Sequence, residues 1–368
     1  MPTNPPLSTA KSDTVTAYNL NTPTVIQYGL EIQRQLSSTS VLRVGYVGWK
    51  GYNLTRTENI NDKAADPNSG LYNTAGAVKP NPAFGTITFL AADAIANYNG
   101  LQTEVKKTVG NGLTIQASYT YSKMLSDADS TSNRVTDNTG NGYVSLNPSN
   151  PLLDYGRGAY DQRQTFVVNA LYNLPFDKYL KGPALKAAFG GWALNGIWQF
   201  GTGIPLNIND GFNNSGNGDP TQPDRPNLNS GFSNNPINGV TAGCGGGVIP
   251  AGQKLQTPSR WFDPCAFSLP SAGVLADPST VGKNTVTAPG TDVVNLGLSK
   301  TFSLKERAKL QFRSEAFNLL NHPQFGVPNV LLFNSNRTYS GTAGAITITQ
   351  GGGGLGGRNI QFGLKLTF

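Results

Sequence analysis

The chain has 368 residues, of which 38% are hydrophobic and only 13% charged, with 44 Gly and 24 Pro. Soluble domains usually carry about 25% charged residues, so this composition predicts surfaces that are polar without being ionic. The 14 Tyr, 17 Phe and 4 Trp exclude a solvated coil. The net charge of +7 comes from scattered Lys and Arg with no basic run, which excludes a typical nucleic-acid-binding protein.

Strict alternation of apolar and polar residues is the strongest local signal, and a period of two predicts β-strands. In chain order it predicts about nine long strands. They lie near residues 24–36, 40–50, 97–109, 112–125, 161–174, 191–208, 291–304, 307–320 and 358–368. A shorter apolar piece at 84–90 either extends a strand or lies within a loop. Most of these strands are about twice the usual five or six residues, and a bilayer needs about 9–11 tilted residues.

Short and long connections alternate along the chain. The short joints are Ser37–Thr39, Gly110–Asn111 and Leu304–Ala308, and a compact link covers 175–190. The long loops lie near 51–96, 126–160, 209–290 and 321–357. Outer-membrane barrels have short periplasmic turns and long extracellular loops. The predicted fold is therefore all-β, an antiparallel transmembrane β-barrel portion over residues 24–368, with residues 1–23 as the remnant of an extracellular loop.

The direction of the final strand agrees with this topology. With the short joints in the periplasm, the last strand runs inward and leaves Phe368 on the periplasmic side. No segment reaches the ~18 apolar residues of a spanning helix. The start, MPTNPPLSTA, lacks the basic and apolar regions of a secretory signal, so a fragment or a late-starting reading frame is expected. The alternative is a secreted sandwich or propeller, whose strands would be shorter and whose loop lengths would not alternate.

Three segments resemble known outer-membrane proteins. The ending RNIQFGLKLTF resembles the last strand of such barrels, and the resemblance makes Phe362, Leu364, Leu366 and Phe368 the signal read by the barrel-assembly machinery. The segment FNLLNHPQFG, residues 317–326, resembles TonB-dependent receptors, and more narrowly the Oar-like receptors of acidobacterial kind. WFDPCAF, residues 261–267, followed by the strand start at 292–299, is similar to the same group.

This resemblance covers the chain from about residue 97 onward. It implies the last nine strands of a 22-stranded importer, whose partners would be outer-membrane lipid, the assembly machinery, a plug domain, the TonB complex and an unknown small solute. The chain departs from the family in having no plug, TonB box or N-terminal regulatory-like domain. A sheet of nine strands would expose two unpaired edges in lipid, so it is not expected to form a pore alone.

Few residues suggest chemistry. His322 is the only histidine and has no second His or Cys near it, so we interpret it as a turn residue. Cys244 and Cys265 have neither CxxC nor zinc spacing, and in an exported protein they either form a disulfide or remain free thiols. The Gly-rich run 351–357 lacks the Lys and Ser/Thr of a P-loop, and 210–224 lacks the spacing of an EF-hand. No catalytic residue, cofactor or metal site is predicted.

Two further groups of residues depend on the barrel interpretation. Charged residues on the polar strand faces would line a lumen, and aromatic residues toward the strand ends would form a girdle or pack locally. The first group is Glu31, Arg34, Glu104, Lys106, Arg313 and Glu315, and the second is Tyr46, Trp49, Tyr121, Tyr172 and Trp198. None is assigned to substrate. The leading hypothesis is solute uptake; the alternative is an adhesion or structural barrel that binds partners through its loops, and an enzyme is not expected.

Overall fold

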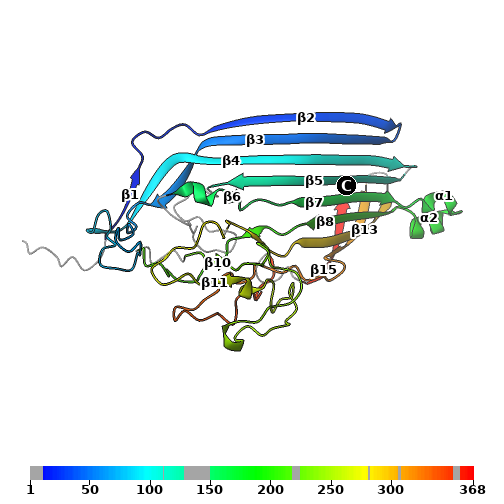
Figure 1. Ribbon diagram of the computed structural model, residues 1–368. Helices are drawn as coiled ribbons and strands as arrows, with labels where there is room; N and C mark the ends of the chain where they lie inside the picture. Colours follow the sequence, from blue (N-terminus) through cyan, green and yellow to red (C-terminus); the bar gives the residue numbers. More distant parts are fainter. Residues whose placement is uncertain are drawn as a thin grey trace, which may run out of the picture.

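The computed structural model describes residues 11–110, 112–127, 150–217, 224–280, 282–305, 308–350 and 357–368. All nine predicted long strands are present, and they form one antiparallel sheet in which each long strand pairs with the next along the chain (Figure 1). They are β2 (Thr24–Ser37), β3 (Ser40–Asn59), β4 (Phe84–Val109), β5 (Leu113–Ser126), β7 (Gln164–Asn173), β8 (Trp192–Gly201), β13 (Thr291–Lys305), β14 (Ala308–Phe317) and β15 (Asn359–Thr367). The all-β prediction is therefore confirmed.

The sheet is open. Its outermost strands are β2 and β15, and no strand in the described part of the chain pairs with their outer edges. Short turns join the strands at one end, hereafter the turn end, where helices α1 (Phe176–Tyr179) and α2 (Pro183–Phe189) also lie (Figure 1). The long connections leave from the opposite end, the loop end. Among the described residues, no helix is long and apolar enough to cross a membrane.

The predicted loop at 51–96 is shorter than expected, because both flanking strands continue. Residues 54–59 of β3 pair with residues 88–94 of β4, so the apolar piece at 84–90 is the start of β4. This ribbon projects beyond β5, which ends where Ser126 pairs with Ala96. The freed edge of β4 is filled by β1 (Lys11–Thr16), a parallel strand within the region expected to be only loop. Four alanines of β4, Ala91, Ala92, Ala94 and Ala96, are buried in this part of the chain.

Two strands end earlier than their alternation predicted. β8 stops at Gly201 instead of residue 208, and β14 stops at Phe317 instead of residue 320. Asn318, directly after β14, has a φ of 50°. Asn tolerates this left-handed conformation better than most residues, and it turns the chain away from the sheet.

The two faces of the sheet differ in polarity. Between β14 and β15, Leu310 and Phe312 stand opposite Leu366 and Leu364 on one face, whereas Gln311 is opposite Lys365 on the other. We call these the apolar face and the polar face. Large side chains of the apolar face are open to the surroundings; Leu364 is 72% exposed. An apolar outer surface with a polar inner surface is the pattern of strands that line a barrel in lipid.

The long connections from β8 to β13 and from β14 to β15 fold together into a compact unit with its own core. We call residues 202–290 and 318–350, as far as they are described, the loop module. Two short strand pairs organise it: β9 (Pro205–Leu206) with β12 (Val286–Thr287), and β10 (Asn227–Leu228) with β11 (Phe267–Ser268). The buried core comprises Leu206, Ile208, Phe262, Ala266, Phe267, Val286, Ala288, Val330, Leu332, Phe333 and Ala343.

Three single turns of 3-10 helix, η1 (Pro151–Asp154), η2 (Gly245–Gly247) and η3 (Pro264–Ala266), and the two-residue strand β6 (Gly156–Arg157) complete the described elements. η1 and β6 lie in the connection between β5 and β7, and β6 pairs with the last two residues of β5. They place Asp154 and Arg157 beside the loop module.

Candidate functional site

The polar face of the sheet is the first candidate surface for solute. It is rich in neutral amide and hydroxyl side chains and carries charges of both signs. Register places on it Gln27, Glu31, Arg43, Gln102, Glu104, Lys106, Gln116, Thr120, Asn169, Asn195, Gln199, Asn295, Lys309, Gln311, Arg313, Glu315, Gln361 and Lys365. Such a surface offers hydrogen bonds without a strong field of one sign.

Some of the charged side chains on this face interact across neighbouring strands. The Arg43 guanidinium lies 3.2 Å from Glu31 and 4.0 Å from Glu104, joining three neighbouring strands. Gln361 donates to a Glu315 carboxylate oxygen at 2.7 Å. The pairs are partly exposed, so each contributes little to stability.

One sequence prediction about the faces is wrong, and one open alternative is decided. Arg34 stands opposite Leu42 and on the same side as Ile32, so it belongs to the apolar face near the turn end. Trp49 lies on the polar face, stacked on Tyr98 with ring centroids 6.3 Å apart, and so is not part of an outer girdle. Both residues follow the unbroken alternation of their strands, which places Arg34 on the side of Ile32 and Trp49 on the side of Val47.

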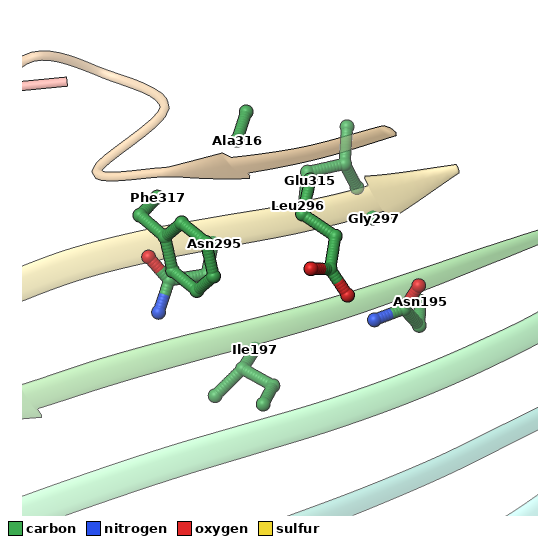
Figure 2. Close-up of a pocket in the computed structure, with 8 residues that line it drawn as sticks. All are labelled: Asn195, Ile197, Asn295, Leu296, Gly297, Glu315, Ala316 and Phe317. Atoms are coloured by element: carbon green, nitrogen blue, oxygen red, sulfur yellow. The ribbon is translucent and has the colours of Figure 1, made fainter. Parts of the chain in front are cut away.

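A shallow hollow opens on the polar face where β8, β13 and β14 meet (Figure 2). Asn195, Asn295, Glu315 and Phe317 line it, while Ala316 of the same strand points to the other side. Its volume is about 170 Å³, which holds a few water molecules, whereas sites for drug-sized ligands measure ~300–1,000 Å³. The hollow is therefore part of a wall and not a solute pocket by itself.

The loop module is the second candidate surface. It is fastened to the sheet at the start of β13, where the Gln324 side chain accepts from the Asp292 N–H at 2.9 Å and donates to the Asp292 carbonyl at 2.7 Å. Within the module, next to the end of β8, the backbone packs closely at Gly203, whose missing Cβ would stand 1.7 Å from the Ala288 carbonyl oxygen. His322, as expected, is in the turn after β14, with its N–H donating to Asn318 Oδ1 at 3.0 Å.

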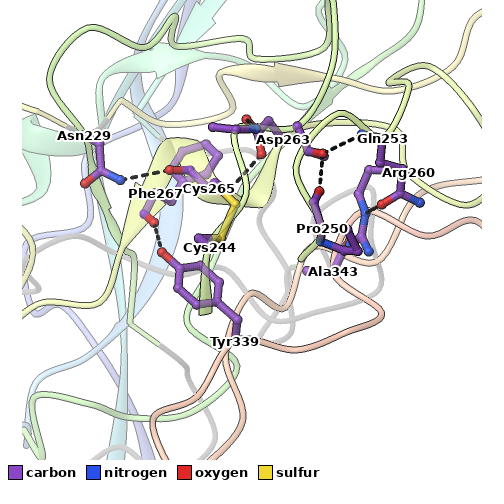
Figure 3. Close-up of a disulfide and its surroundings, with 12 residues drawn as sticks. Asn229, Cys244, Pro250, Gln253, Arg260, Asp263, Cys265, Phe267, Tyr339 and Ala343 are labelled. Atoms are coloured by element: carbon purple, nitrogen blue, oxygen red, sulfur yellow. Dashed lines mark hydrogen bonds between the residues drawn. A yellow bond between two sulfur atoms is a disulfide. The ribbon is translucent and has the colours of Figure 1, made fainter. Parts of the chain in front are cut away.

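A disulfide between Cys244 and Cys265 closes the centre of the module (Figure 3). Around it, the Asp263 carboxylate accepts from the Cys265 N–H at 3.0 Å, and the Tyr339 hydroxyl donates to the Phe267 carbonyl at 2.7 Å. The Arg260 guanidinium donates to the carbonyls of Ala343 and Gly341. The segment WFDPCAF thus joins the two long connections, which the sequence did not reveal because its contacts lie far along the chain.

Buried charges hold the neighbouring loop. Asp161, whose side chain is fully buried, accepts from Arg157 at 2.9 Å and lies 3.0 Å from Arg163. Asp210 is also buried. Its pKa is raised well above the usual value, mainly because burial disfavours the charged form and also because the nearby Asp224 carboxylate repels it. Within the described ranges, no group of three His, Cys, Asp or Glu side chains could hold a metal ion. Residues 351–356 of the Gly-rich run lie outside the described residues.

Comparison with solved structures finds distant likeness to outer-membrane transporters. The outer membrane transporter YddB from Escherichia coli is 12% identical with a TM-score of 0.45, covering 96% of this chain and 34% of that one. The FrpB iron transporter from Neisseria meningitidis is 10% identical with a TM-score of 0.40, covering 96% and 32%. The ferripyoverdine receptor of the outer membrane of Pseudomonas aeruginosa is 12% identical with a TM-score of 0.38, covering 94% and 27%.

The chain thus spans about a third or less of the length of these structures. A comparison with curated proteins finds no match. Residues 2–361 match the family described as outer membrane beta barrel domain, which is nearly the whole chain. An open antiparallel sheet with one apolar and one polar face agrees with that match, and the chain belongs to the outer membrane beta barrel domain family, a family of the outer membrane.

Proposed function

We propose that this chain is the C-terminal barrel segment of a TonB-dependent outer-membrane receptor that takes up a small solute. The observation that carries the proposal is the open sheet, with both edges unpaired among the described strands and a polar face that would look into a lumen. The segments FNLLNHPQFG and WFDPCAF resemble such receptors, and this resemblance supports the receptor class over outer-membrane barrels in general. A plug domain, the TonB complex and the barrel-assembly machinery would be its partners.

The open edges require completion. Every unpaired N–H and C=O group in hydrocarbon costs several kcal/mol, so a spanning sheet must close on itself. The outer edges of β2 and β15 would each leave such a row of groups in lipid. Further strands, about thirteen in a 22-stranded barrel, would pair with both edges.

The loop module would capture solute at the outer end. Its disulfide and core hold the surface in one shape, which reduces the conformational entropy lost on binding. Solute would then pass along the polar face once the plug moves.

The mass of the native protein tests whether further strands complete the barrel. In an outer-membrane fraction, an antibody against the loop module should detect a heat-modifiable protein much larger than the 39.0 kDa of this chain. A stable 39.0 kDa species without cross-linked strand partners would contradict it. Reading the coding region upstream of Met1 for a plug domain and TonB box provides an independent check.

A compact, disulfide-bonded loop module also favours the second candidate, a barrel whose loops bind a partner at the cell surface without transport. Growth of a strain lacking the gene on single limiting nutrients separates the two. A growth defect shared with a strain lacking TonB supports uptake. A loss of surface binding with no such defect supports adhesion.

A further inference from the structure

The connection between β7 and β8, residues 174–191, is longer than its position requires. The other turn-end connections, after β2, β4 and β13, need only two or three residues to reverse the chain. The β7–β8 connection instead forms α1 and α2, which project beyond the ends of the strands (Figure 1). We call it the interfacial link. Its extra length therefore serves something other than joining two strands.

The interfacial link exposes apolar side chains that a protein in water would bury. Phe176 is 44% exposed, Tyr179 78%, Leu185 49% and Phe189 56%. No residue of α2 is buried in the protein, and Leu185 and Phe189, four residues apart, lie on one face of that helix. A contiguous exposed apolar surface indicates an interaction site.

Positive charge accompanies this apolar surface. Lys178, Lys181 and Lys186 are exposed, and Asp177 is the only acidic residue of the link in the sequence. Apolar residues interleaved with lysines are typical of segments that lie in the interface of a membrane with anionic lipids.

Lys300 ties the link to the lipid side of the sheet. It stands opposite Trp192 on the apolar face and is only 2% exposed. Its ammonium nitrogen lies 5.2 Å from the Trp192 ring centroid and 4.7 Å from that of Phe302, and it donates to the Ala188 carbonyl near the end of α2. Cation–π contacts and a helix C-terminal carbonyl both stabilise the charge. The helices are thereby attached to the lipid-facing side at the membrane edge.

We propose that the interfacial link binds anionic phospholipid headgroups of the periplasmic leaflet. Its apolar side chains enter the boundary between headgroups and acyl chains, and its three exposed lysines contact lipid phosphates. The partner is anionic phospholipid because positive charge exceeds negative charge in the link and because the link continues the lipid-facing surface of the sheet. The inference depends on the outer-membrane location and not on transport.

Trp192 supplies a local probe. The native protein, extracted from outer membranes, is placed in phosphatidylcholine bilayers with a trace of brominated phosphatidylglycerol or brominated phosphatidylcholine. The contribution of Trp192 to quenching is the difference between wild type and W192F. We expect brominated phosphatidylglycerol to quench this component at least about twofold more strongly.

The variant K178Q/K181Q/K186Q should abolish the preference while keeping the quenching itself. The matched control is K11Q/K63Q/K254Q, which removes the same charge at the loop end and should keep the preference. Equal quenching by the two lipids in wild type overturns the anionic partner. No quenching of Trp192 overturns the membrane contact, and a preference that survives the triple glutamine variant overturns the assignment to these lysines. Heat-modifiable migration on gels verifies that each variant is folded.

Discussion

Asp154 and Arg225 form a buried ion pair between two separate long connections of the barrel, with 2.5 Å between Asp154 Oδ1 and Arg225 Nη2. Neither side chain is more than 1% exposed. Asp154 ends η1 in the β5–β7 connection, and Arg225 belongs to the loop module. The pair therefore fixes one loop against another at a buried point.

Removing one partner should loosen both connections. A charge left alone in a buried place costs ~3–5 kcal/mol, so R225M should destabilise the local structure by about 3 kcal/mol. Amide hydrogen exchange in the loop module should then be roughly a hundredfold faster. The double variant D154L/R225M removes both charges and should exchange almost like wild type. If exchange is accelerated equally in the single and double variants, lost packing and not the unpaired charge causes the destabilisation.

The disulfide should be intact and stabilising in the exported protein. Cys244 and Cys265 are 21 residues apart, and closing such a loop contributes ~3 kcal/mol in the loop-entropy estimate. Maleimide should label neither thiol until reductant is added, and C244S/C265S should raise proteolysis of the loop module. Labelling of the folded protein without reductant contradicts the bond.

Asp210 should make the loop module more stable at acid pH. Its pKa is raised in the fold by burial and by Asp224, so between the unfolded pKa of about 3.9 and the folded value the folded state holds the extra proton. Stability therefore falls as pH rises through that window. D210N keeps the shape without the charge and should raise stability at pH 7 and flatten this dependence, measured by thermal unfolding at several pH values.

D224N is the control for that experiment. The Asp224 carboxylate accepts from the Ser215 N–H at 2.5 Å and from the Ser215 hydroxyl at 3.2 Å. Loss of the Asp224 carboxylate in D224N should therefore destabilise the loop module by about 1–3 kcal/mol. If D210N unfolds at a lower temperature than D224N at pH 7, the charged form of Asp210 is not destabilising and the prediction is wrong.

Gly203 should not tolerate a side chain. A methyl group there would meet the Ala288 carbonyl, and such overpacking costs ~1–3 kcal/mol. G203A should therefore loosen the module where it joins β8, seen as faster exchange around 202–206. G357A, at a glycine with open space, should leave exchange unchanged.

Phe368 should matter for assembly more than for packing. It is 94% exposed, so F368A removes few contacts within this chain. If the final strand is the assembly signal, F368A should lower the amount in the outer membrane severalfold. The control V240A changes a residue that is 55% exposed in the loop module. Equal amounts of F368A and wild type in the membrane contradict that role.

The sequence alone determined the nine long strands and their order. Successive side chains of a strand point to opposite faces, and the two faces of this sheet have different surroundings. The alternation of Ile360, Phe362, Leu364 and Leu366 with polar residues is therefore visible within the strand itself. Because antiparallel neighbours are joined directly, chain order was also sheet order.

Only the tertiary structure decided the form of the loops and the ends of the strands. The core around Phe262 and Leu332 joins residues seventy positions apart without any period, and the Asp154–Arg225 pair likewise joins distant residues. Buried charge pairs and irregular packing carry no repeating signal, so sequence patterns did not predict them. The early turn at Asn318 and the extended β3–β4 ribbon depend on pairing partners, which a single strand does not specify.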